Sequence, residues 1–136
     1  MDNTNPQYVD FNIICSDDCG NAQKKIFLKE FTVAFANNDM VFITENITES
    51  FHWNIIGKKS IQGKEKFVEN LKEMKNSKVT ELNIRNIITH GNTGSVNGTI
   101  ILENKKIYAF CDVYNFTSTS KNSKIKELTS YVIEIS

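Results

Sequence analysis

The carboxylate of Asp112 lies in the most unusual chemical setting of this 136-residue sequence. Over residues 108–116, aromatic side chains alternate with small or polar ones, as in a β-strand with one buried face. Because every second side chain of a strand shares a face, Asp112 is expected beside Phe110 and Tyr114. A carboxylate among aromatic rings needs hydrogen-bond partners or has a raised pKa. Either Asp112 is a functional carboxylate inside a pocket, or it pairs with a surface lysine on the other side of a twisted strand.

His52 is the second group that could move a proton, and Trp53 and Asn54 follow it in a strand-like segment. Alternation allows His52 and Asn54 inward with Trp53 outward, or the reverse, because a one-residue slip exchanges the faces of a strand. If His52 and Asp112 converge, the imidazole could act as a base near its ordinary pKa of ~6.5, and Asp112 could orient it or donate a proton. In the alternative interpretation His52 is a hydrogen-bonded structural histidine, and Trp53 is a core or dimer contact.

Two further polar side chains are candidates for ligand contacts. Asn97 interrupts a strand-like run rich in isoleucine and valine. An inward amide there would need hydrogen-bond partners or cost ~1–3 kcal/mol, whereas an outward Asn97 would be solvated. Tyr114 could present its hydroxyl to a cavity, although aromatic residues on strands often pack in a core or an interface instead.

An amphipathic helix is predicted over residues 21–38. Phe27, Phe31 and Phe35 recur at every fourth position, which places the three rings along one side of a helix. The opposite side is mostly charged. This helix is expected to pack its phenylalanine side on the rest of the domain.

Shorter elements are predicted after this helix. Asp39 is placed to cap a second helix over residues 40–47, because its carboxylate can accept hydrogen bonds from unpaired backbone N–H groups. A strand over residues 50–56 and a turn at residues 57–59 follow. Gly63 then opens a third helix. The buried side of the third helix is expected to carry Phe67, Val68, Leu71 and Met74.

After residue 76 the pattern changes to strands. Four runs separated by turn residues predict strands over residues 79–90, 95–102, 106–116 and 125–135. Short connections between consecutive strands are typical of an antiparallel meander, and the order of helices and strands predicts an α+β fold rather than alternating βαβ units. The expected organisation is an N-terminal arm, residues 1–20, followed by one α+β domain, residues 21–136.

Three segments, in this order and spacing, resemble the cone-shaped fold shared by SnoaL-like polyketide cyclases, ketosteroid isomerases and nuclear transport factor 2. They are residues 35–39, residues 48–53 followed by Gly57 and Gly63, and residues 112–116 followed by residues 124–128. The resemblance covers roughly residues 21–135. It implies a curved antiparallel sheet packed on N-terminal helices, of the cystatin-like or nuclear-transport-factor-2-like class. It also implies a ligand inside the cone and a homodimer formed through the outer sheet face.

The resemblance also assigns candidate site residues. Ketosteroid isomerases hold an enolate with a tyrosine and a protonated aspartate, beside a carboxylate base. Asp112 falls at the donating aspartate, but Phe31 falls at the tyrosine and Asn54 at the base. Steroid isomerase activity is therefore not expected. SnoaL-like cyclases rely on acidic and histidine groups, so Asp112 and His52 are the catalytic candidates. The candidate ligand contacts are Phe31, Trp53, Asn54, Asn97 and Tyr114.

Charge and cysteine content argue against several classes of function. Sixteen basic residues balance sixteen acidic ones, so neither nucleic acid nor an anionic membrane is an expected partner. The sequence shows no secretory signal and no apolar run of ~20 residues, which favours a cytoplasmic protein. Cys15, Cys19 and Cys111 are expected as free thiols of a reducing compartment. Because His52 and His90 are far apart in the sequence, no metal site is expected.

These observations predict a protein that holds a small, largely apolar organic molecule in the cone. Any catalysis would be acid–base chemistry of the cyclase, isomerase or hydratase type, without metal or cofactor. The alternatives are a non-catalytic ligand-binding or sensor protein and a protein-interaction module on the same fold. An enzyme should bring His52 and Asp112 together in a pocket. A binder should show an apolar pocket with one or two polar groups, and an adaptor should fill its cone with side chains.

Overall fold

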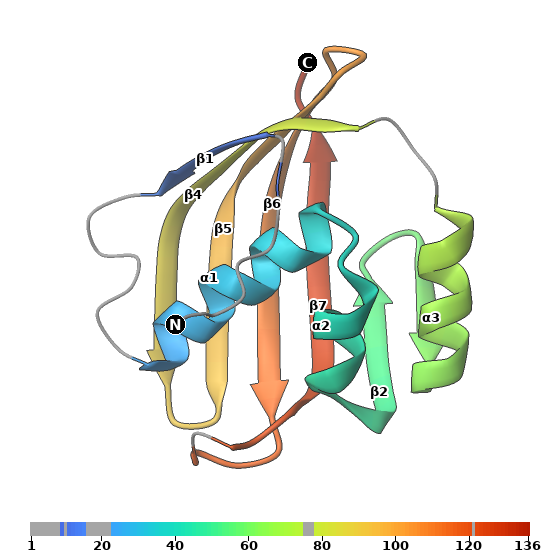
Figure 1. Ribbon diagram of the computed structural model, residues 1–136, viewed down its shortest axis with the longest axis vertical. Helices are drawn as coiled ribbons and strands as arrows, with labels where there is room; N and C mark the ends of the chain where they lie inside the picture. The colour runs from blue at the N-terminus through green and yellow to red at the C-terminus, as the bar shows by residue number, and fades with distance from the viewer. Residues whose placement is uncertain (1–8, 10, 16–22, 75–77, 121) are drawn as a thin grey trace.

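The computed structural model describes residues 9, 11–15, 23–74, 78–120 and 122–136. Its helices are α1 (Gln23–Ala36), α2 (Met40–Glu45) and α3 (Lys64–Glu73). Its strands are β1 (Asn12–Cys15), β2 (Ile47–Ile55), β3 (Lys59–Gln62), β4 (Val79–His90), β5 (Thr93–Leu102), β6 (Ile107–Phe116) and β7 (Ile125–Glu134). The mixed α+β class agrees with the sequence-based prediction (Figure 1).

The described strands form one curved sheet in the order β1-β4-β5-β6-β7-β2-β3. From β4 to β7, consecutive strands pair antiparallel, which confirms the expected meander. β2 runs parallel to β7 and antiparallel to β3, and β1 runs parallel to β4 at the other edge. α1 crosses the concave face of the sheet, and α2 and α3 lie on the side of β2 (Figure 1). The sheet is curved but not closed (Figure 1).

The phenylalanine ladder of α1 attaches the helix to the sheet. Phe31 is fully buried, and its ring centroid lies 5.8 Å from that of Tyr114 in a perpendicular contact. Phe35 makes a similar contact with Trp53 at 5.2 Å. Edge-to-face aromatic pairs contribute about 0.5–1.5 kcal/mol beyond the area that they bury. The predicted helix and its buried side are therefore confirmed.

The step between α1 and α2 forms as predicted, because the Asp39 carboxylate accepts a hydrogen bond from the backbone N–H of Phe42 at 3.2 Å. α2 is shorter than expected, since Ile47 already belongs to β2. Ile47 pairs with Ile125 of β7, and the backbone N–H of Ile125 donates to the Asn46 carbonyl at 2.9 Å. Pairing with β7 thus places in the sheet a residue that the local pattern assigned to a helix.

β3 and β1 are strands that the sequence analysis did not define. β3 begins at Lys59, within the expected turn, and places Ile61 opposite Trp53. Its sequence, Lys-Ser-Ile-Gln, contains one apolar residue, which is too little alternation to identify a strand. β1 lies in the expected N-terminal arm and pairs with β4. Both strands depend on pairing with partners that local patterns do not reveal.

The curvature of the sheet has a local cause in β4 and β5. The register of the pair shifts between Ile84 and Asn86, and a β-bulge of this kind bends a strand. Gly98 of β5 lies opposite Ile84, and a Cβ atom on Gly98 would clash with the backbone carbonyl of Asn83. The close approach of the two strands therefore requires glycine at this position.

The cysteines differ from the expectation. Cys15 is disulfide-bonded, which corrects the prediction that it is a free thiol. Cys111 is free, and Cys19 lies outside the described residues. The bonded Cys15 removes one argument for a reducing compartment. None of the described helices combines the length and the apolar character that a membrane span requires.

Candidate functional site

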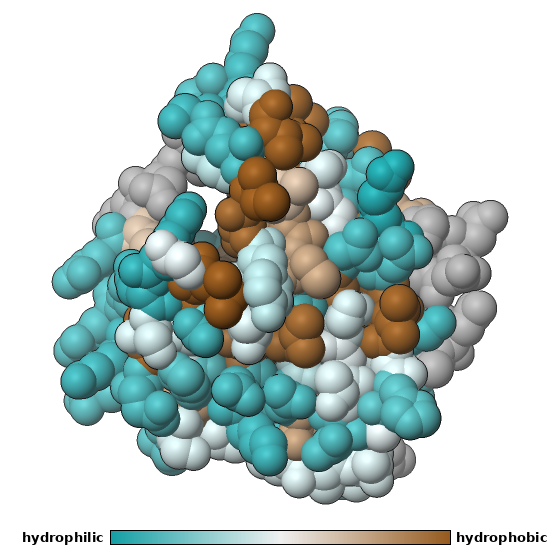
Figure 2. Space-filling model, turned by 180° about the vertical axis from the view of Figure 1, so that it is seen from behind, coloured by the Kyte–Doolittle hydropathy of each residue, from teal (hydrophilic) through white to brown (hydrophobic). Residues whose placement is uncertain are grey.

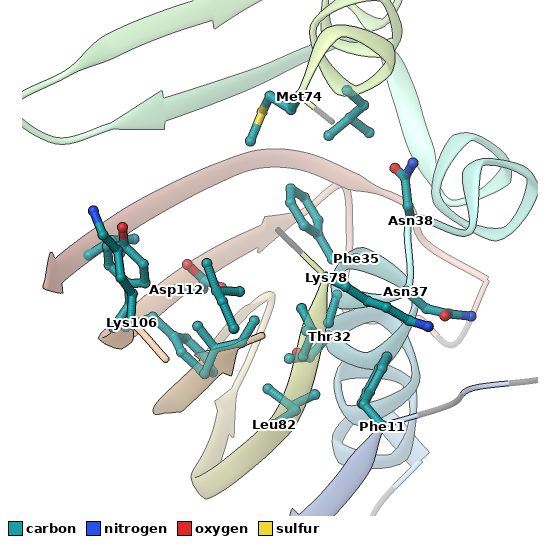
Figure 3. Close-up of a pocket in the computed structure, with 18 of the residues that line it drawn as sticks. Phe11, Thr32, Phe35, Asn37, Asn38, Met74, Lys78, Leu82, Lys106 and Asp112 are labelled. Carbon is teal, nitrogen blue, oxygen red and sulfur yellow. The ribbon is translucent and has the colours of Figure 1, made fainter. Parts of the chain in front are cut away.

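A cavity of about 830 Å³ lies between the helices and the concave face of the sheet (Figure 3). This volume is within the range of roughly 300–1,000 Å³ that is typical of small-molecule sites. The helical wall contains Phe35 of α1, with Leu71 and Met74 from α3 and its C-terminal end. The sheet wall is formed mainly by Val79, Leu82, Ile100, Leu102, Tyr108, Phe110 and Val132. Because most of the wall is apolar, the cavity suits a molecule with an apolar body.

Asp112 projects from β6 into this cavity (Figure 3). The register of β6 and β7 places Asp112 opposite Ser130, whose hydroxyl is hydrogen-bonded to the carboxylate. Ser130 is buried, and its Oγ accepts a hydrogen bond from Nε1 of Trp53 at 2.9 Å. Trp53, Ser130 and Asp112 therefore form a chain of hydrogen bonds that ends in the cavity and orients the carboxyl group.

The protonation of Asp112 is governed by its removal from water. Burial raises the pKa of Asp112 from its ordinary 3.8 to about 7, while the hydrogen bond from Ser130 acts in the opposite direction. Near neutral pH the carboxyl group is therefore present in both forms, as a hydrogen-bond donor when protonated and as an acceptor when ionised. Among the described residues that line the cavity, Asp112 is the one carboxyl group.

Tyr114 and Thr32 lie beside this network. Tyr114 is fully buried, and burial, together with the nearby charge of Asp112, raises its pKa well above the ordinary value. The phenol is hydrogen-bonded to Thr32, whose hydroxyl donates to the backbone carbonyl of Leu28 at 2.7 Å. The phenol therefore stays protonated at neutral pH and supports the wall of the cavity.

Three lysines mark the opening of the cavity. Lys58, Lys78 and Lys106 are exposed to solvent and also line the cavity. Asn37 and Asn38, at the C-terminal end of α1, lie on the same rim (Figure 3). The site is therefore apolar in its interior, with one carboxyl group inside and basic side chains at its entrance.

His52 does not meet Asp112. Because Trp53 points into the core, alternation turns His52 to the outer face of the sheet. There Nε2 of His52 lies 2.5 Å from Oγ of Ser60, and its Nδ1 lies 3.7 Å from Oε2 of Glu127. The structure therefore does not form the expected acid–base pair, since its two members lie on opposite faces of the sheet.

The five expected ligand contacts are all found outside the cavity wall. Phe31 and Tyr114 are fully buried core residues behind it, and Trp53 supports Asp112 from a buried position. Asn54 lies on the outer face with His52, because it is two positions along the same strand. Asn97 also faces outward, since its neighbours in the strand are buried. Of the candidate catalytic and ligand-contact residues named from the sequence, Asp112 alone lines the cavity.

Sequence reasoning missed Thr32, Ser130 and the three lysines. Thr32 is a polar residue next to Phe31 on the buried side of α1, and this signal was available in the sequence. Ser130 could be found only from the register that pairs it with Asp112. The lysines lie far apart in the sequence, so their common place in the cavity lining is seen only in the folded structure.

No protein-family model and no curated relative matches the sequence. Solved structures do match. An NTF2-like protein of unknown function from Cytophaga hutchinsonii is 25% identical, over 79% of this chain and 97% of that one, with a TM-score of 0.59. An LEH-like epoxide hydrolase from M. tuberculosis is 18% identical, over 78% of this chain and 79% of that one, with a TM-score of 0.63. Nuclear transport factor 2 from Cryptosporidium parvum is 14% identical, over 80% of this chain and 90% of that one, and its TM-score is also 0.63.

This chain has the nuclear-transport-factor-2-like fold. The family resemblance expected from the sequence is thereby confirmed at the level of architecture. Proteins of the nuclear-transport-factor-2-like fold in this comparison include a hydrolase and a transport factor, so the fold alone does not distinguish catalysis from binding.

Proposed function

We propose that this protein binds a small, largely apolar organic molecule in the cavity between α1 and the concave face of the sheet. The observation that supports the proposal is a cavity of about 830 Å³ with mainly apolar walls and one interior carboxyl group, Asp112. Pockets of this composition gain affinity from apolar contact and orient their ligand through a few polar atoms. Asp112 would supply that orientation, because Ser130 holds it in place.

Binding without catalysis is the simpler interpretation. An acid–base enzyme of the expected kind would bring His52 and Asp112 together. Instead His52 lies on the outer face beside Ser60 and Glu127. Tyr114 is not among the residues that line the cavity, and its phenol stays protonated. The interior therefore offers one titratable group to a ligand among the described residues.

One observation favours a second candidate, cofactor-free acid–base catalysis by Asp112. The pKa of this carboxyl group is raised to about 7, and a catalytic acid or base is most effective when its pKa is near the working pH. Exchange of the α-protons of 2-decanone in D₂O, followed by NMR, tests this candidate. Catalysed exchange that is lost in Asp112→Asn would support it, and exchange equal to that of the buffer would refute it.

The binding proposal is tested with 1-decanol, a neutral probe with an apolar body and one hydroxyl. Ala36 lines the cavity at the end of α1, so Ala36→Phe should fill part of the space and Ala36→Ser should not. We expect calorimetry to detect decanol binding to the wild type and to Ala36→Ser, and much weaker binding to Ala36→Phe. The single tryptophan, Trp53, provides a local fluorescence signal through its contact with Ser130. Absence of binding to the wild type, or equal binding to all three proteins, would contradict the proposal.

The proposed homodimer uses the outer face of the sheet, where apolar side chains are exposed among polar ones (Figure 2). Tyr131 and Ile133 are exposed on this face. The registers of β5, β6 and β7 place uncharged residues at the centre of this face, namely Ser95, Asn97, Thr99, Ala109, Cys111, Val113, Thr129, Tyr131 and Ile133. Interface centres are depleted of charge, and a two-fold dimer matches one such surface with itself. Sedimentation velocity should show a dimer that Tyr131→Glu dissociates and Val41→Glu, on exposed α2, does not. A monomeric wild type would refute this proposal.

A further inference from the structure

Basic side chains outnumber acidic ones among the described residues that line the cavity. Among the described lining residues, Lys58, Lys78 and Lys106 carry ammonium groups, and Asp112 is the one carboxyl group. The whole chain has sixteen basic and sixteen acidic residues, so the excess of lysine is local to this site. A local excess of positive charge at the mouth of an apolar cavity favours an anionic group on the ligand.

The three lysines lie at one end of the sheet. Lys78 immediately precedes β4 and Lys106 immediately precedes β6, and the strand registers bring both starts next to the end of β5. Lys58 lies in the turn after β2. Because β2 runs parallel to β7, and β7 ends beside the start of β6, this turn lies at the same end. The three lysines therefore lie in separate connections at the same end of the sheet.

Other groups at this end of the sheet reduce the positive charge, and Lys78 itself has an interaction partner. Nζ of Lys106 lies 3.8 Å from Oε1 of Glu134, but both side chains are about half exposed, and solvent-exposed pairs of this kind are weak. The C-terminal end of α1 also faces the rim through Asn37 and Asn38. A helix end carries a partial charge of about half an elementary charge, which is smaller than that of the lysines together.

We propose that the ligand is an amphipathic carboxylic acid, with its carboxylate at the lysine rim and its apolar body inside the cavity. This inference rests on the proposed function and specifies the class of ligand. The orientation follows from desolvation, since a carboxylate buried between Phe35 and Phe110 would lose its water and lie near Asp112. At the rim it keeps much of its hydration and meets the basic side chains that line the entrance. A hydroxyl or carbonyl on the body of the ligand would then meet Asp112.

Three probes of equal length separate charge from apolar contact, namely decanoate, 1-decanol and decylammonium. We expect calorimetry at neutral pH and low salt to show decanoate binding about tenfold more tightly than decanol, because each exposed charge pair contributes up to a few-fold. Decylammonium should bind more weakly than decanol. The preference for decanoate should decrease in about 0.5 M salt, which screens exposed charges.

The lysines are tested by Lys58→Gln, Lys78→Gln and Lys106→Gln, singly and together. Their side chains are exposed, so these changes should leave the fold intact. The matched control is Lys66→Gln on α3, because Lys66 is exposed and is not among the residues that line the cavity. The triple variant should bind decanoate and decanol equally. Lys66→Gln should keep the full preference.

The possible outcomes separate this inference from the proposed function. Equal affinity of the wild type for decanoate and decanol would overturn the carboxylic acid assignment and leave the apolar pocket intact. A preference for decanoate that survives in the triple variant would also overturn it, because the charge would then be recognised elsewhere. Failure of all three probes to bind would overturn the proposed function itself.

Discussion

Replacing Asp112 by asparagine should remove most of the pH dependence of stability between about pH 4 and pH 7. The folded protein holds the pKa of Asp112 at about 7, against an ordinary 3.8. Between these values the unfolded chain has lost the proton and the folded protein retains it. Because the folded state binds more protons in this window, the free energy of unfolding decreases as the pH rises. Above pH 7 both states are ionised, and the decrease ends.

The magnitude follows from the same two pKa values. A tenfold change in proton affinity corresponds to about 1.4 kcal/mol, so ionisation of Asp112 in the folded protein costs about 4 kcal/mol. That is a large share of the roughly 5–15 kcal/mol that stabilises an ordinary domain. Asparagine has nearly the same shape and no charge, and its carbonyl can accept the hydrogen bond from Ser130. Asp112→Asn should therefore be close to the wild type at pH 4 and more stable than it at pH 8.

Urea unfolding followed by Trp53 fluorescence measures both proteins from pH 4 to pH 8. Glu69→Gln, on the exposed side of α3, is the control for loss of a surface carboxylate and should keep the wild-type slope. If the wild type and Asp112→Asn gave parallel curves over this range, the carboxyl group would not be held where its charge is disfavoured.

Ser130→Ala removes the hydrogen bond that lowers the pKa of Asp112. In the same urea assay, the free energy of unfolding of this variant should therefore continue to decrease to a higher pH than that of the wild type. Gly98→Ala should reduce the free energy of unfolding by roughly 1–3 kcal/mol, since the added methyl group meets the carbonyl of Asn83, and an unchanged urea midpoint would contradict this account of the curvature. His52→Ala should leave decanol affinity within about twofold of the wild type in calorimetry, because His52 lies on the outer face; a larger loss would place it in the site.

The regular elements could be predicted where the apolar pattern is long. The period of Phe27, Phe31 and Phe35 identified α1, and four alternating runs identified the meander. The boundary between α2 and β2 could not be predicted, because Ile47 enters the sheet through its pairing with Ile125 of β7. Short strands such as β3 could not be predicted either, because their pairing with another strand defines them and their own sequence pattern does not.

The site was only partly predictable for a related reason. Asp112 stood out because a carboxylate among aromatic residues is unusual at any position. The faces of His52 and Trp53 stayed open in the sequence, since a shift of one residue exchanges them. The structure decides between the two arrangements through the hydrogen bond from Trp53 to Ser130. Alternation along one strand says which side chains share a face, but not which face is inward.

The most direct test of the account is the ¹³C NMR signal of the Asp112 side-chain carboxyl group, assigned by its loss in Asp112→Asn. This signal should titrate near pH 7 and shift when decanol is added, because the half-buried carboxyl group lies in the wall of the proposed ligand-binding cavity. A signal that titrates near the ordinary 3.8 and does not respond to the probe would contradict both the burial of Asp112 and its place in the site.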